Sequence, residues 1–250
     1  MKHWVACLLA VSLLSGCAGT GEHLPLATIA QRGGACPSLS ADQELVLSLS
    51  AELIAEGRLH AALANLESVP GNLPEVRLRK ARILRLLADP RAEPLYSGLL
   101  GGCLNAQAHH GLGQIAAARG NYPEARGYLD VAAKLSPTDA AVRNDLGLVL
   151  LHLRQLNQAR FELLTALELD QAGAQPLDNL LTLLLYQDQW QEAAELVRRR
   201  GLSPQQFQAA EERSRALKQE DLARAYGDTS PPAQVEDASW IKVRPATAVP

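Results

Sequence analysis

The residue whose type and position most clearly indicate chemical reactivity is Cys17, whose thiol follows a short apolar segment at the N-terminus. Lys2 gives this segment a positive start, and the apolar run from Trp4 to Leu14 carries a single hydroxyl side chain. A run of this length is too short to span a bilayer, which takes about 20 apolar residues. A positive start followed by a short apolar run is the layout of a secretory signal peptide. Residues 1–16 are therefore predicted to be a signal peptide, although they lack the usual small-x-small cleavage site.

The stretch Leu14-Ser15-Gly16-Cys17 resembles the lipobox of bacterial lipoproteins at every position that this motif specifies. The resemblance implies that the Cys17 thiol takes a diacylglycerol, that the chain is cut before this residue, and that the freed amine is acylated. Several acyl chains anchor a protein stably, whereas a single chain holds it only marginally. In lipoproteins an Asp after the cysteine favours the inner membrane, so Ala18 implies the outer membrane, with the protein facing the periplasm. The alternative is an ordinary signal peptide that happens to carry a cysteine.

Two further cysteines, Cys36 and Cys103, remain once Cys7 has left with the signal peptide. The periplasm is oxidising, so one disulfide could join the glycine-rich arm around Cys36 to the loop that contains Cys103. A disulfide requires Cα atoms within about 7 Å of each other, which the sequence does not establish, and two unpaired thiols are an equal alternative. There is no C-x-x-C motif, so redox catalysis is not supported.

The other residue types that perform chemistry show no catalytic arrangement. No two of the six histidines stand at i and i+4, and His109 and His110 would point about 100° apart on a helix, so we predict no metal site. The sequence contains no G-x-S-x-G, no G-x-x-x-x-G-K-[ST] and no G-x-G-x-x-G. We therefore predict that the protein is not an enzyme and that it uses no cofactor besides the lipid on Cys17.

Composition narrows the class of partner. A formal net charge of −3 and a pI near 6.1 argue against a nucleic-acid-binding surface, which would carry a basic stripe. Aromatic residues make up 4% of the chain, too few for a base- or sugar-stacking platform. Abundant Leu and Ala with few β-branched residues favour helices. The expected partners are thus proteins and, through Cys17, the lipid bilayer.

A repeat with a period of 34 residues organises the centre of the chain. Small or apolar residues recur on what would be the first helix of each unit and alanines on the second, namely Leu112, Gly113, Ala125, Leu146, Gly147, Ala159, Leu180 and Ala193. A bulky residue recurs at Tyr122, Leu156 and Trp190, where it would close the end of each pair. Leu181 departs from the pattern, since a small residue is expected there.

These positions resemble the signature of the tetratricopeptide repeat (TPR), including its closing proline at Pro137. The resemblance implies an all-α, right-handed α-solenoid with about five helix pairs and a capping helix. The physical reason is that one helix pair cannot bury its apolar face alone, whereas stacked pairs bury a continuous core.

The predicted organisation follows the chain from the signal peptide to a polar tail. A lipidated flexible arm covers 17–38, and two degenerate TPR-like helix pairs cover 39–104. The repeats fill 105–201, with units at about 106–139, 140–173 and 174–201. Ser203-Pro204 offers an N-cap and a proline at the first helical position, so 202–226 is predicted to be the capping helix. Residues 227–250 are predicted to be a disordered tail, in which Trp240 could anchor a partner or fold back onto the solenoid.

The repeat register also predicts where a partner would bind. The first helix of each unit should line the concave face, and its inward positions include Gln107, His110, Gln114, Asn144, Leu148, Gln175, Asp178 and Thr182. Amide, imidazole and aliphatic groups together suit an extended peptide or a helix. The alternative is that these side chains serve packing between helices, especially Leu148.

Taken together, the lipobox, the chain length near 250 residues, the short arm and the repeats resemble the TadD family of tight-adherence (Tad/Flp) pilus assembly lipoproteins. That resemblance implies a periplasmic adaptor that assists assembly of the outer-membrane secretin through which the pilus passes. The type IV pilotin family, also TPR lipoproteins that deliver a secretin, and scaffolds of peptidoglycan hydrolases are the alternatives.

Overall fold

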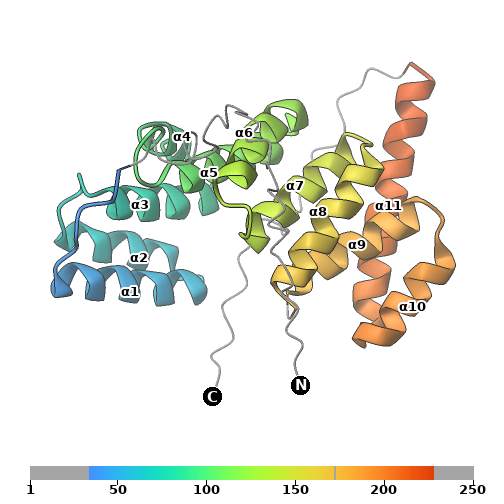
Figure 1. The fold of residues 1–250 in the computed structure, drawn as a ribbon, viewed down its shortest axis with the longest axis horizontal. Helices are drawn as coiled ribbons and strands as arrows, with labels where there is room; N and C mark the ends of the chain where they lie inside the picture. The colour runs from blue at the N-terminus through green and yellow to red at the C-terminus, as the bar shows by residue number, and fades with distance from the viewer. Residues whose placement is uncertain (1–33, 172, 228–250) are drawn as a thin grey trace, which may run out of the picture.

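The computed structural model describes residues 34–171 and 173–227, and within these ranges the chain forms helices joined by short turns, with no strand. The helices stack in chain order from α1 at one end to α10 and α11 at the other (Figure 1). Their bounds are α1 Ala41–Ala55, α2 Leu59–Asn65 with a 3₁₀ turn Leu66–Ser68, α3 Pro74–Leu86, α4 Ala92–Ser97, α5 Asn105–Ala118, α6 Tyr122–Leu135, α7 Ala140–His152, α8 Leu156–Leu169, α9 Ala174–Tyr186, α10 Trp190–Arg200 and α11 Pro204–Ala225.

The all-helical fold expected from the repeat is confirmed for the described residues. The three central units correspond to the pairs α5/α6, α7/α8 and α9/α10, and two pairs with shorter second helices precede them. Pro94 lies inside α4, the shortest of these helices. The signal peptide, Cys17 and most of the arm lie outside the described residues, as does the tail segment around Trp240.

The same turn closes the first helix of every pair. One residue takes a positive φ, which is +74° at Gly57, +54° at Ala88, +74° at Gly120, +61° at Arg154 and +57° at Asp188. In each turn the next residue donates its N–H to the carbonyl five residues earlier, as Gln155 does to Leu150. Three of these residues are not glycine, although a side chain in this region is strained by about 1–2 kcal/mol. The packing of the two helices, rather than local preference alone, therefore maintains the turn.

Two glycines set the distance between the helices of a pair. A Cβ atom on Gly113 would lie 2.7 Å from Cγ of Leu129, and one on Gly147 would lie 2.7 Å from Cγ of Leu163. Both leucines are fully buried. The leucine of the second helix thus fills the space that a side chain on the first helix would occupy.

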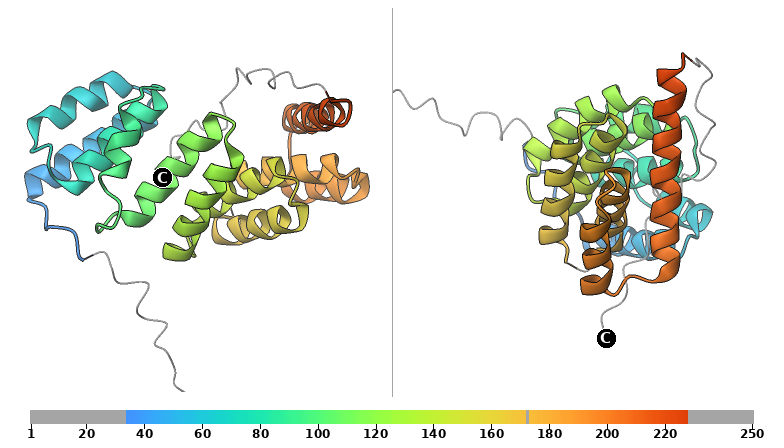
Figure 2. Two further views of the ribbon diagram at one scale, coloured as in Figure 1. Left: turned by 90° about the horizontal axis from the view of Figure 1, so that it is seen from above. Right: turned by 90° about the vertical axis from the view of Figure 1, so that its right-hand side faces the viewer.

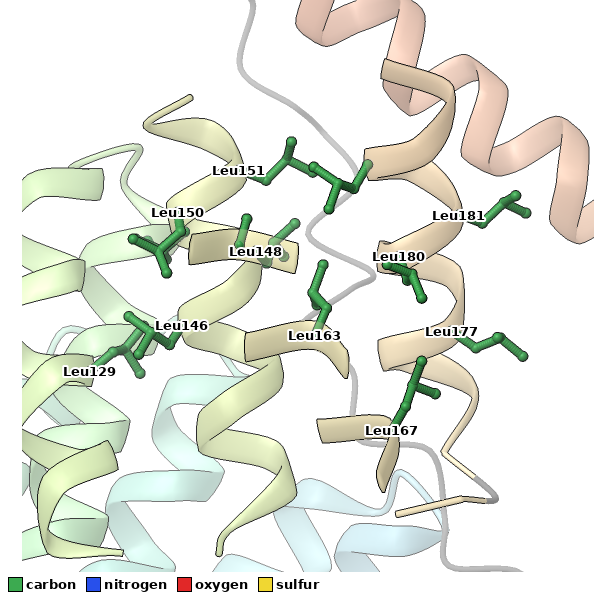
Figure 3. Packing of buried hydrophobic residues seen from close by; sticks show 14 of the residues in the cluster. Leu129, Leu146, Leu148, Leu150, Leu151, Leu163, Leu167, Leu177, Leu180 and Leu181 are labelled. Atoms are coloured by element: carbon green, nitrogen blue, oxygen red, sulfur yellow. The ribbon is translucent and has the colours of Figure 1, made fainter. Parts of the chain in front are cut away.

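The buried leucines form a continuous layer through α6, α7, α8 and α9 (Figure 3). Leu151, Leu163, Leu181 and Leu183 are among the largest side chains that are fully buried. Because each helix pair contributes to the cluster of its neighbour, the pairs stabilise one another. Two smaller clusters join α1 to α3 and α3 to α5.

The α9/α10 pair closes less tightly because Leu181 takes the place of Gly113 and Gly147. Val197, which corresponds to the buried leucines of the other pairs, is only partly buried. Trp190 is 50% exposed and does not close the end of its pair as the sequence suggested. An open crevice of about 440 Å³ lies between α8, α9 and α10, and leucines and charged or polar side chains line it together.

We predict that Gly147→Leu destabilises the fold by about 3 kcal/mol or more, because the new side chain would overlap Leu163 and force α7 from α8. Thermal unfolding followed by circular dichroism measures the loss. The matched control is Gly127→Leu, since Gly127 is an exposed helical glycine with open space at its Cβ. The control should keep or slightly raise the Tm; an equal loss in both variants would contradict the packing role of Gly147.

A stacked pair of rings joins the second central pair to the first. Tyr122, at the start of α6, lies parallel to His152 at the end of α7, with ring centroids 4.2 Å apart and an interplanar angle of 10°. Burial, followed by the positive charges of Arg154 and Arg224, lowers the pKa of His152 to about 4. The imidazole is therefore neutral in the folded protein at neutral pH.

Protonation of His152 should weaken the fold in mild acid. Between the ordinary pKa of 6.5 and the folded value of about 4, the unfolded chain binds a proton that the folded chain does not, so stability falls as the pH drops through this window. The loss is at most about 3 kcal/mol, since one pKa unit corresponds to 1.36 kcal/mol. Below about pH 4 this residue adds no further loss.

We predict that His152→Phe, which preserves the ring stack, reduces the fall in Tm between pH 7 and pH 4.5 relative to the natural chain. His60→Phe is the control, because it removes an exposed histidine that lies outside the ring stack. Identical pH profiles for the natural chain and His152→Phe would show that His152 does not titrate in this way.

Candidate protein-binding groove

The capping helix covers the part of the concave face that belongs to α9. Gln206 of α11 donates a hydrogen bond to the Asp178 carboxylate at 3.1 Å, and Arg213 donates to the Thr182 hydroxyl at 3.1 Å. Thr182 is 2% exposed. Gln175, at the start of α9, is partly buried. The expectation that Asp178 and Thr182 face an open groove is wrong, because α11 occupies this surface (Figure 2).

Two candidates on α7 are also used between helices. Asn144 is 4% exposed, and its carbonyl oxygen accepts a hydrogen bond from Asn179 of α9 at 2.9 Å. Leu148 is 7% exposed and belongs to the central apolar cluster. Both side chains therefore serve packing between helices rather than partner binding.

The open part of the face carries a network of four side chains on α5 and α7. Nε2 of His110 and Nε2 of Gln114 each lie 2.7 Å from the same carboxylate oxygen of Asp145, and Asn144 donates to the other oxygen at 3.1 Å. The side chains of His110 and Asp145 are 18% and 13% exposed. Gln107, one turn before His110, is exposed. The network fixes His110 and Gln114 in place at the border between core and solvent.

Asp145 is the residue that sequence reasoning missed. Its burial alone would raise the pKa, but the hydrogen bonds and charge of His110, the hydrogen bond of Gln114 and the charge of Arg85 together lower it below its ordinary value. The carboxylate is therefore ionised at neutral pH and acts as the acceptor for both donors. A signal was available, because Asp145 is the one acidic residue in the segment 140–152.

A second cluster fastens α11 across the open end of the solenoid. The Arg154 guanidinium donates to Asp221 at 2.8 Å and to the Leu217 carbonyl at 2.9 Å, and it lies 5.3 Å from the centre of the Tyr186 ring. The Tyr186 hydroxyl donates to the other oxygen of Asp221 at 2.5 Å. Arg154 thus links the turn after α7 to α9 and α11.

The disulfide Cys36–Cys103 joins the residues before α1 to the loop before α5, with the Cα atoms 5.2 Å apart. Glu75 lies beside it, and its carboxylate and the two sulfur atoms are within 4.8 Å of one another. The sulfurs are bonded to each other, so they do not offer thiolate ligands to a metal. Within the described ranges no helix is long and apolar enough to cross a membrane.

We predict that Arg154→Leu releases α11 while the pairs α5/α6 and α7/α8 remain folded. Amide hydrogens of α11 should exchange about tenfold faster or more, because each charge-assisted hydrogen bond contributes about 1.5–3 kcal/mol. Hydrogen exchange followed by mass spectrometry measures this effect. Arg198→Leu is the control, since Arg198 forms an exposed ion pair within α10; faster exchange throughout the chain, or none in α11, would contradict the fastening role of Arg154.

Residues 106–139, which contain α6 and all but the first residue of α5, match the tetratricopeptide repeat family. Over 217 residues the chain is 43% identical to the TPR repeat-containing protein PA4299 of Pseudomonas aeruginosa, and the match covers 86% of each chain. This likeness extends well beyond the single matched repeat.

Two solved structures share the fold. PilF of Pseudomonas aeruginosa aligns with a TM-score of 0.54 and 20% identity, over 74% of this chain and 84% of PilF. The thermophilic TPR protein TTC0263 of Thermus thermophilus aligns with a TM-score of 0.52 and 22% identity, over 70% of this chain and 98% of that one. At these identities the comparison establishes the arrangement of helices alone.

Proposed function

Because the chain belongs to the family of TPR repeat-containing proteins, whose stacked helix pairs bind other proteins, we propose that it is an adaptor anchored to the outer membrane through a lipid on Cys17. It faces the periplasm and assists assembly or localisation of a Tad/Flp pilus secretion apparatus by binding its secretin.

The observation that carries this proposal is the part of the concave face that α11 leaves uncovered. Gln107 is exposed, and His110 and Gln114 are fixed by Asp145 through their Nε2 atoms. The bonds to Asp145 leave Nδ1 of His110 and Oε1 of Gln114 for other partners. Positioned side-chain groups of this kind suit the N–H and C=O groups of an extended peptide, because little freedom is lost on binding.

The membrane anchor and the pilus assignment rest on the sequence. The lipobox supports lipidation of Cys17, and Ala18 supports the outer membrane. The layout of arm and repeats supports the Tad/Flp assignment. A tethered adaptor would raise the local concentration of its partner at the membrane, since two linked sites meet as if at millimolar concentration.

We predict that crosslinking in intact cells, capture of the anchored protein and mass spectrometry recover a pilus secretin. Cys17→Ala should abolish recovery from the outer-membrane fraction. Ala18→Asp is the matched control for anchoring, because it keeps the lipid and should move the protein to the inner membrane.

Three outcomes decide the proposal. Recovery of cell-wall hydrolases and no secretin would favour the alternative, in which the protein is a scaffold for peptidoglycan hydrolases. A secretin captured equally well by Cys17→Ala would separate partner binding from anchoring and overturn the lipid-dependent part. Recovery of Cys17→Ala in the outer membrane would overturn the lipoprotein assignment.

A further inference from the structure

Three arginines form a stripe along α3. Arg79, Arg82 and Arg85 stand three residues apart, so neighbouring side chains lie on one face of the helix. All three are partly buried. α3 packs against α4 and α5 and is the first helix of its pair, as α5 and α7 are of theirs (Figure 1).

No described residue forms an ion pair or a hydrogen bond with the side chains of these arginines, whereas most other arginines in the described ranges have such a partner. Nε and Nη1 of Arg85 are buried without an acceptor. A buried donor that lacks an acceptor destabilises the fold, and a charged donor does so more strongly. Unpaired guanidinium groups in such positions indicate a missing anion.

The arginines also repel one another. Burial and the charge of Arg82 lower the pKa of Arg79, and burial and the charge of Arg85 lower the pKa of Arg82. Stacking three like charges along one helix face destabilises the helix. The stripe therefore weakens the chain that carries it unless an anion binds there.

Arg85, at the C-terminal end of the stripe, lies near the groove already described. The charge of Arg85 acts on Asp145 of α7, the carboxylate that holds His110 and Gln114 of α5. Asp145 attracts Arg85, but its hydrogen bonds within the described residues go to His110, Gln114 and Asn144 and not to an arginine of α3. We propose that Arg79, Arg82 and Arg85 bind the side-chain carboxylates of an acidic segment of the protein partner, whose remaining backbone lies along His110 and Gln114.

Charge and shape favour this occupant over other anions. Guanidinium groups bind carboxylates through two parallel hydrogen bonds. The net charge of −3 disfavours nucleic acid, and partly buried arginines on a helix face are poorly placed for a flat bilayer surface. The chain itself carries one acidic pair outside the described residues, Glu236-Asp237, which the test treats as a competing occupant.

The test uses the full-length chain in detergent and a fluorescein-labelled peptide of six glutamates, with a peptide of six glutamines as the neutral probe. We expect the natural chain to bind the glutamate peptide and Arg79→Gln/Arg82→Gln/Arg85→Gln to bind it at least about tenfold more weakly. Arg198→Gln/Arg199→Gln/Arg200→Gln is the matched control, because it removes the same number of arginines from exposed positions on α10. The control should bind the glutamate peptide nearly as tightly as the natural chain does. A small loss of affinity is expected because the control also carries fewer positive charges.

Thermal unfolding without peptide is the second measurement. Removing the mutual repulsion should raise the Tm of the α3 triple variant, whereas a purely structural role would lower it. A lowered Tm with unchanged peptide binding overturns the proposal. If Glu236→Gln/Asp237→Asn strengthens peptide binding about tenfold and lowers the Tm, the site holds the chain's own tail, and the proposal of a partner segment is overturned.

This inference rests on the adaptor function proposed above, but it does not depend on the secretin. Peptide binding by the purified chain tests the arginine stripe without any pilus protein. If the α3 triple variant captures a secretin as well as the natural chain does, the adaptor function stands. The arginine stripe is then not the surface that contacts the secretin.

Discussion

The close approach of two helices over a missing side chain is the constraint on which the rest of the fold depends. Gly113 and Gly147 allow Leu129 and Leu163 to lie directly against the neighbouring helix backbone. Each pair then presents a flat apolar side to the next pair, and the leucine layer continues from α6 to α9 (Figure 3). A bulky group at either glycine would separate the helices and break this layer. The closely packed helix pair is thus the repeating unit of the solenoid, and the stacking of these pairs produces the concave face.

The exception at Leu181 explains the C-terminal end. With a large side chain at this position, α10 does not complete the repeat as α6 and α8 do, and an open crevice lies beside it. The other side of α9 is instead covered by α11, through Gln206 and Arg213, and Arg154 fastens that helix from the turn after α7. The solenoid therefore ends in α11, which covers the part of the concave face that belongs to α9. Within the described residues, α3, α5 and α7 lie outside the part of the face that α11 covers.

The sequence predicted the local features well and the long-range ones poorly. A period of 34 residues located the alanines of all three units and the glycines of the first two, and Ser203-Pro204 marked the start of α11 through capping chemistry that acts within four residues. The groove positions followed from the register, but their exposure did not, since the burial of Thr182 depends on Arg213, 31 residues later. Asp145, Arg154 and the arginines of α3 look like ordinary surface charges in the sequence. Their roles come from which partners the fold brings near them.

The disulfide Cys36–Cys103 has a mechanical consequence. It connects the N-terminal arm to the loop before α5 and encloses α1 to α4 in a closed loop of the chain. A pulling force applied to the arm passes through the sulfur atoms to the loop before α5 and bypasses the first two helix pairs. Those pairs, whose second helices are the shortest of the described α-helices, then bear no tension. The central repeats, including α5 and α7, take the load directly, whereas α3 lies inside the closed loop and is shielded from it.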